Sequence, residues 1–166
     1  MGLREDFENE LTRLVNAAVI GPAMVTVQDA AGVQVRAELT AVETLGCAVS
    51  RVLVSAPHLK SADVAVLKQW SDELAERITY LLESLTPLET DEEPGRVLMR
   101  SAAPQTLPLG REYYECMLAA ESHGSVSFRR YRAESGVAGR TAVDMTLTRE
   151  VVGRLVGDLV ETMPGP

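Results

Sequence analysis

Apolar residues recur at spacings of three and four in a central stretch, residues 61–85. The series consists of Leu67, Trp70, Leu74, Ile78, Leu81 and Leu85. On a helix with about 3.6 residues per turn these positions fall in one stripe, which is the pattern of a helix that lies against a surface. Ser61 or Asp63 is suited to cap the first turn, and Pro87 forbids continuation beyond the end. The sequence therefore predicts a central helix over residues 61–85.

Helical spacing also occurs near both ends of the chain. Residues 3–19 place apolar positions on one side and polar positions on the other, and Gly21 and Pro22 follow. Residues 149–163 carry a broad apolar surface and follow Thr148, whose side chain is suited to cap a helix. We therefore expect an N-terminal helix at about residues 3–19 and a C-terminal helix at about residues 149–163.

The period changes to two in the segments between these helices. The clearest alternation places Val33, Val35, Ala37, Leu39 and Ala41 against polar neighbours. Such alternation is typical of a strand with one buried face. Short turn sequences divide the first block, about residues 24–56, into three strands, and they divide the second block, about residues 88–147, into about five.

Helices that stand before, between and after two blocks of strands predict an α+β fold, and strands joined by short turns pair antiparallel. We expect one domain, residues 1–166, with an antiparallel sheet or sheets of about eight strands packed by three helices in the order α-βββ-α-βββββ-α. Whether the strands form one sheet or two stays open. This order resembles that of acidic, dimeric secretion-chaperone domains, although the second block has more strands and no residue motif accompanies the resemblance.

Composition and charge narrow the possible partners. The 166 residues carry a formal charge of -8, so we expect neither nucleic acid nor an anionic membrane as a partner. The first ten residues lack the basic and apolar regions of a signal peptide, and no apolar run is long enough to span a membrane. The two cysteines, Cys47 and Cys116, are far apart in the sequence and favour reduced thiols. We therefore expect a cytoplasmic protein.

The common catalytic and metal-binding motifs are absent from the sequence. His58 has no carboxylate at helical or strand spacing to orient it, and His123 lies in a predicted turn. Cys116 is expected in the core, whereas Cys47 is expected to be more exposed and is a weak redox candidate. The acidic residues at 89–93 lack the pattern of a calcium loop and are typical of a charged hairpin tip. We expect no catalytic residue, cofactor or metal, and a role other than catalysis is favoured.

Three arginines crowd one predicted strand of this acidic chain. Arg130 and Arg132 share a face with Phe128, while Arg129 and Tyr131 point to the opposite face. A guanidinium group binds a carboxylate or phosphate through paired hydrogen bonds, so Arg129, Arg130 and Arg132 are candidate contacts for an anion. The favoured alternative is cross-strand pairing with nearby acidic residues, namely Glu112, Glu115 or Asp144.

Two glycines interrupt the predicted last helix. Gly153 and Gly157 each cost about 1 kcal/mol relative to alanine in a helix interior, and close approach of a second helix would offset this cost. That helix is either part of the same chain or part of another subunit. Packing against the sheet alone is the simpler alternative. We expect Gly153, Val156, Gly157 and Val160 to form a surface for self-association.

Two functions are compatible with these patterns. The favoured one is a non-catalytic protein–protein interaction module that self-associates and receives its partner at a sheet edge or helix face. It predicts an extended apolar surface patch. The alternative is a binder of a small anionic ligand, or an atypical enzyme, with a pocket between helix and sheet. It predicts that Arg129 or Arg130 converges with Tyr113, Tyr114 or His58 on a concave surface.

Overall fold

A computed structural model describes residues 2–121 and 124–165 of the chain. Within these residues it contains three α-helices, one short 3-10 helix and ten strands. Their order and bounds are α1 (Leu3–Asn16), β1 (Ala23–Gln28), β2 (Gln34–Val42), β3 (Gly46–Ser55), η1 (Pro57–Leu59), α2 (Val64–Arg77), β4 (Leu85–Asp91), β5 (Arg96–Ser101), β6 (Gln105–Leu107), β7 (Gly110–Ala119), β8 (Ser125–Glu134), β9 (Thr141–Val143), β10 (Met145–Thr148) and α3 (Arg149–Glu161).

The strands form one antiparallel sheet with the main order β1-β2-β3-β8-β7-β5-β4. Three short strands lie off this path: β6 pairs with β7, β9 with β8, and β10 with β3. The predicted α+β class, the three helices and the two blocks of antiparallel strands are confirmed. The strands exceed eight because the second block contains the short strand β6, and because β9 and β10 are separate strands on either side of Asp144.

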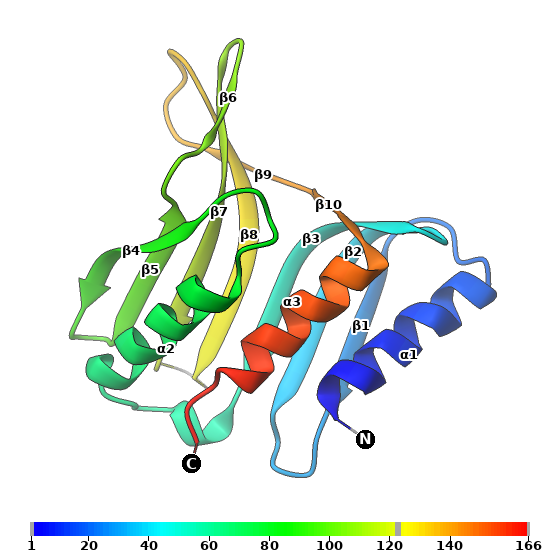
Figure 1. Ribbon diagram of the computed structural model, residues 1–166, viewed down its shortest axis with the longest axis horizontal. Helices are drawn as coiled ribbons and strands as arrows, with labels where there is room; N and C mark the ends of the chain where they lie inside the picture. Colours follow the sequence, from blue (N-terminus) through cyan, green and yellow to red (C-terminus); the bar gives the residue numbers. More distant parts are fainter. Residues whose placement is uncertain (1, 122–123, 166) are drawn as a thin grey trace.

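The three helices lie on the same face of the sheet (Figure 1). α1 packs on β1 and β2, α3 packs on β3 and β10, and α2 packs on β4, β5 and β7. Side chains along each strand alternate accordingly: in β2, Val35, Ala37 and Leu39 are buried beneath the helices, whereas Arg36 and Glu38 point away. We call the face without helices the uncovered face. The predicted alternation of this strand is therefore confirmed, and it identifies which residues the uncovered face presents.

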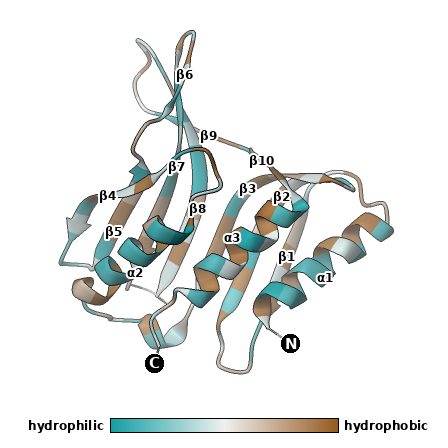
Figure 2. Ribbon diagram, in the orientation of Figure 1, coloured by the Kyte–Doolittle hydropathy of each residue, from teal (hydrophilic) through white to brown (hydrophobic). Residues whose placement is uncertain are grey.

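The helices carry the apolar stripes that the sequence indicates. Hydrophobic and hydrophilic bands alternate along them in Figure 2, and Leu3, Phe7, Leu11 and Leu14 of α1 are buried. Their burial against the sheet stabilises the fold, because each large apolar side chain contributes about 1.5–3 kcal/mol. In the described part of the chain, no helix has the length and apolar character needed to cross a bilayer.

The central helix is shorter than the sequence predicts. α2 ends at Arg77, because Ile78 leaves the helical region with φ -87° and ψ 85°. Ile78 and Leu81 are nevertheless buried, so the apolar spacing identifies residues of the core but not the end of the helix. The chain must turn back after α2 to form β4, and a longer helix would carry it past the sheet. Pro87 lies in β4, an edge strand, where it interrupts the register beside Met99 rather than ending a helix.

Candidate functional site

A buried carboxylate on the uncovered face, that of Glu115 on β7, binds two arginines. Arg140, from the segment before β9, donates to Oε1 from Nη2 at 2.9 Å and to Oε2 from Nη1. Arg100 on β5 donates to Oε2 from Nη2 at 3.1 Å. The hydrogen bonds to Glu115 raise the pKa of Arg140 above its ordinary value. The two guanidinium groups therefore balance the negative charge of the Glu115 carboxylate, and the carboxylate holds both groups in place.

Two tyrosines support the same arginines. Tyr113 on β7 and Tyr131 on β8 are opposite each other in register, and their ring centroids are 6.1 Å apart. The guanidinium carbon of Arg140 lies 3.8 Å from the centroid of Tyr131, and that of Arg100 lies 4.8 Å from the centroid of Tyr113. The electron-rich ring faces attract the cations. The tyrosines and Glu115 together give a preorganised platform on the uncovered face.

Arg129 is the sequence-predicted anion contact that lies on this platform. It is opposite Glu115 in register, yet within residues 2–121 and 124–165 its guanidinium has no hydrogen bond, and its Nε is buried without a partner. Arg51, Arg129 and Arg140 line a hollow of about 240 Å³ that also includes Glu115 and Tyr131. Arg51 is paired with Glu38 at 2.9 Å and Arg140 with Glu115, so the charge of Arg129 is the one left unbalanced, and it makes the hollow positive. It is chemically suited to a carboxylate or phosphate group.

Arg130 and Arg132 lie on the helix-covered face, as the alternation predicts, and both bind Glu112. The Nε of Arg130 donates to Oε1 at 3.2 Å, and the Nε of Arg132 donates to Oε2 at 2.8 Å. Burial raises the pKa of Glu112, but the hydrogen bonds from these arginines outweigh burial, so the pKa is lowered. For these two arginines the favoured alternative, pairing with an acidic residue of the neighbouring strand, is confirmed.

The two glycines of α3 lie against α1 of the same chain. A Cβ at Gly153 would come within 2.9 Å of Glu8, and a Cβ at Gly157 would come within 2.8 Å of Arg4. Close approach of a second helix therefore explains both glycines, and this helix is intramolecular. The four residues expected to mediate self-association are placed as follows: Gly153, Val156 and Gly157 are buried, and Val160 is half-buried. Val156 belongs to the core of the monomer, and self-association stays a prediction.

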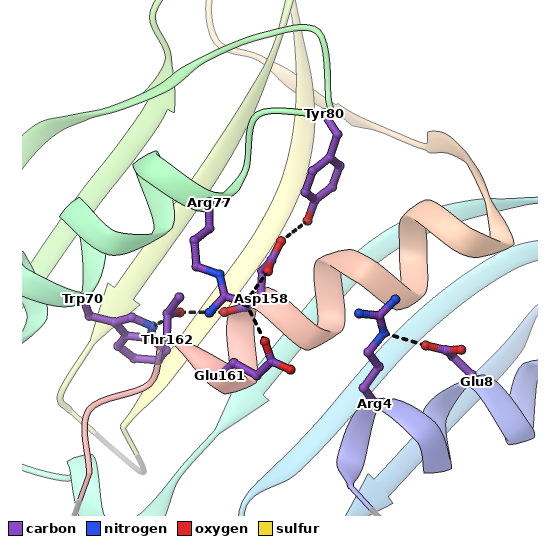
Figure 3. A network of polar contacts seen from close by, with 8 residues as sticks. All are labelled: Arg4, Glu8, Trp70, Arg77, Tyr80, Asp158, Glu161 and Thr162. Atoms are coloured by element: carbon purple, nitrogen blue, oxygen red, sulfur yellow. Dashed lines mark hydrogen bonds and ion pairs between the residues drawn. The ribbon is translucent and has the colours of Figure 1, made fainter.

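A polar network that the sequence did not predict joins α2 to α3. It comprises Trp70, Arg77, Tyr80, Asp158, Glu161 and Thr162 (Figure 3). Tyr80 donates to Asp158 at 2.6 Å, Arg77 lies 3.0 Å from the same carboxylate, and the indole nitrogen of Trp70 donates to Thr162 at 2.9 Å. Burial, followed by the hydrogen bond to Asp158, raises the pKa of Tyr80. These groups satisfy one another, so the network holds the helices together and offers no free reactive group.

The residues considered for catalysis do not form a reactive centre. The Nε2 of His58 lies 2.8 Å from the carbonyl oxygen of Pro164, and His123 is outside the described residues. Cys116 is buried as expected, but the expectation that Cys47 is more exposed is wrong: its relative exposure is 4%, and burial raises the pKa of its thiol. Among the described residues, no group of three or more His, Cys, Asp or Glu is placed to hold a metal ion.

Sequence reasoning missed Arg51 and Arg140 as neighbours of Arg129. Arg51 lies on β3, Arg129 on β8 and Arg140 in the segment before β9. Local patterns do not specify which strands pair or in what register. One signal was available: alternation along the strand places Arg129 and Tyr131 on the same face. The exposed large apolar side chains come from different parts of the chain. Met24 lies in β1 and Leu88 lies in β4, and the others lie in connecting segments: Ile20, Leu45, Leu82, Leu109 and Val137.

Comparison with known proteins gives no relative from which to transfer a function, and the resemblance in element order to secretion-chaperone domains gains no support from it. No family model matches the chain, and no match was found among curated proteins or among solved structures.

Proposed function

We propose that the protein is a non-catalytic interaction module whose uncovered face binds an acidic segment of a partner protein. The observation that carries this proposal is the one-sided cover of the sheet, which leaves Arg129, Arg140 and Tyr131 beside Glu115 at the surface. Arginine and tyrosine are enriched at the centres of protein interfaces, because they combine large contact areas with directed hydrogen bonds. This polar surface takes the place of the apolar patch that the sequence led us to expect.

Charge complementarity identifies the kind of segment. Arg129 has no carboxylate partner of its own among the described residues, and Arg51 and Arg140 lie beside it in the hollow. A carboxylate from a partner would complete this arrangement. Because Glu115 and Tyr131 already fix Arg140, little side-chain entropy is lost on binding, which favours affinity.

An apolar row next to the hollow gives the partner a second contact. Leu53 on β3, Met117 on β7 and Leu98 on β5 lie in adjacent register positions across the uncovered face, with Ser127 on β8 between Leu53 and Met117. All four are half-buried. The row suits an extended segment in which an apolar side chain lies next to carboxylates, and this combination distinguishes a protein partner from a simple polyanion.

We propose in addition that the chain self-associates through the edge strand β1. The other edge, β4, contains Pro87, a register shift and acidic residues, and such features prevent pairing between sheet edges. The sequence of β1, AMVTVQ, has neither charge nor proline, so two copies can pair across a two-fold axis without repulsion. A cytoplasmic location is also proposed, and the two free thiols support it.

The test measures binding of a short fluorescein-labelled peptide in which Glu alternates with Ser around one central Leu. We expect Arg129→Gln to weaken binding by roughly tenfold, which corresponds to the loss of one charged hydrogen-bond partner. Arg13→Gln, on the exposed side of α1, is the matched control and should bind like the wild type.

Two further probes decide the class of partner. The same peptide with Lys in place of Glu should not bind, and a single-stranded oligonucleotide should bind more weakly than the acidic peptide. Equal binding by the Arg129→Gln and Arg13→Gln variants, or tighter binding of the oligonucleotide, would overturn the proposal.

A further inference from the structure

A second cavity lies on the helix-covered side, where β3 and β8 diverge beyond their paired residues. β9 pairs with β8 and ends at Val143, which is opposite Arg130. β10 then pairs with β3 and begins at Met145, which is opposite Val49. Asp144 stands at the point of transfer. A cavity of about 500 Å³ opens here, and its lining includes the polar side chains of Glu83, Gln105, Glu112, Tyr114, Arg130 and Asp144. None of these residues lines the hollow on the uncovered face.

Arg130 is held on three sides in this cavity. Its Nη2 lies 3.1 Å from the amide oxygen of Gln105 and 3.0 Å from Oε2 of Glu83, and its Nε is bonded to Glu112. Its guanidinium carbon lies 4.4 Å from the ring centroid of Tyr114. The side chain is 8% exposed, so its position is fixed by the fold rather than by solvent.

Two buried atoms of this cluster have no partner among the described residues. Nη1 of Arg130 is a donor without an acceptor there, and Oε1 of Glu83 is an acceptor without a donor. Buried polar atoms are rarely left in this state, because each has lost its hydrogen bonds to water. Both belong to residues that line the same cavity. A ligand that completes the cluster must therefore bring an acceptor for Arg130 and a donor for Glu83.

The charge of the cavity sets the sign of that ligand. Glu83, Glu112 and Asp144 provide three carboxylates, and Arg130 provides one guanidinium group. Arg132, which does not line the cavity, forms an ion pair with Glu112 and so balances part of its negative charge. A simple anion would meet excess negative charge, whereas a molecule with a positive group would be attracted. This argues against an anion alone at Arg130, which the sequence had suggested.

We propose that this cavity binds a small molecule of the amino-acid type, with a carboxylate on Arg130 and an ammonium group on Glu83 and Asp144. The carboxylate accepts from Nη1 of Arg130, and the ammonium group donates to Oε1 of Glu83. The proposal does not depend on the acidic-segment partner, because the two sites use different residues on different faces of the sheet.

Calorimetric titration with L-lysine tests the proposal, with cadaverine and sulfate as matched probes. Cadaverine is lysine without its carboxylate, and sulfate is an anion without a donor group of its own. We expect saturable binding of L-lysine and binding at least about tenfold weaker for cadaverine and for sulfate. Absence of saturable heat from L-lysine would overturn the proposal, since water molecules would then be the hydrogen-bond partners of Nη1 of Arg130 and Oε1 of Glu83. Equal binding of cadaverine or tighter binding of sulfate would overturn it as well.

Two glutamate variants locate the binding. Glu83→Gln keeps an acceptor for Nη2 of Arg130 but removes the charge that attracts ammonium, so L-lysine should bind about tenfold more weakly. Glu89→Gln, on the exposed edge strand β4, should bind like the wild type. Thermal melts of both variants confirm folding before titration. Equal affinities for the two variants would place any lysine binding elsewhere and overturn the assignment. Arg129→Gln should leave lysine binding unchanged, which separates this test from that of the acidic peptide.

Discussion

The phenol of Tyr80, in the segment after α2, donates a 2.6 Å hydrogen bond to the carboxylate of Asp158 in the last turn of α3 (Figure 3). α2 covers the half of the sheet made by β4, β5 and β7, and α3 lies on β3 and β10. Arg77 and Trp70 of α2 reach the same end of α3, through Asp158 and Thr162. Asp158 therefore joins the groups of helices that cover the two halves of one sheet.

Removal of the Tyr80 hydroxyl should weaken this link. We expect Tyr80→Phe to lower the free energy of unfolding by about 1–2 kcal/mol, because Asp158 loses a donor while it keeps Arg77. Urea unfolding monitored by circular dichroism measures the change. Tyr131→Phe is the control, since no hydrogen bond of its hydroxyl is found in the described structure; an equal loss in both variants would show that the Tyr80 bond contributes nothing particular.

A charge at Leu74 should prevent folding. Leu74 is fully buried in α2, so Leu74→Asp would bury an unpaired carboxylate at a cost of about 4 kcal/mol or more, a large part of the stability of a domain. Leu82→Asp is the matched variant, because Leu82 is 98% exposed and should tolerate the change. Thermal melting of the two proteins checks this expectation. A cooperative wild-type melt for Leu74→Asp would contradict the packing of α2.

Glu112 should make stability depend on pH in the acid range. Its pKa is lower in the folded state than in the unfolded chain, so its contribution is present above the unfolded pKa and is lost as pH falls through the folded pKa. We expect Glu112→Gln to be less stable than the wild type at neutral pH and to lose less stability on acidification. Urea unfolding at a series of pH values measures both slopes, and parallel slopes would show that the ion pairs with Arg130 and Arg132 do not act in this way.

Self-association at β1 should respond to charge on that strand alone. Thr26 is exposed in β1, and Thr26→Lys would bring two lysines together across a two-fold axis. We expect the wild type to be a dimer and Thr26→Lys a folded monomer by light scattering over a range of concentrations. Thr90→Lys on β4 should remain dimeric. A wild-type monomer at every concentration, or a dimeric Thr26→Lys variant, would rule out β1 as the interface.

Patterns along the chain predicted the elements well, because burial of a helix stripe or a strand face repeats at a fixed period. Val35, Ala37 and Leu39 identify β2 without any tertiary information. The end of α2 was not predictable in this way, since Ile78 and Leu81 are buried whether the helix continues or not. The end of a helix depends on the position of the next element in the fold, which here is β4.

The candidate site was predicted only in part, because its residues meet through strand pairing. Alternation alone placed Arg129 and Arg130 on opposite faces. The neighbours of Arg129 required the register of β7 and β8 and the position of Arg140, which lies 25 residues from Glu115. The two unpartnered atoms of Arg130 and Glu83 depend on side-chain geometry, which no sequence pattern carries.

The one-sided cover of the sheet separates two kinds of constraint within single strands. In β7, Tyr114, Cys116 and Leu118 are packed beneath the helices, and their replacement disturbs the core. Glu115 and Met117 alternate with them and face outward. A change of recognition surface can therefore occur at every second residue while the intervening residues keep the fold, so one strand can acquire a new binding specificity without a new architecture.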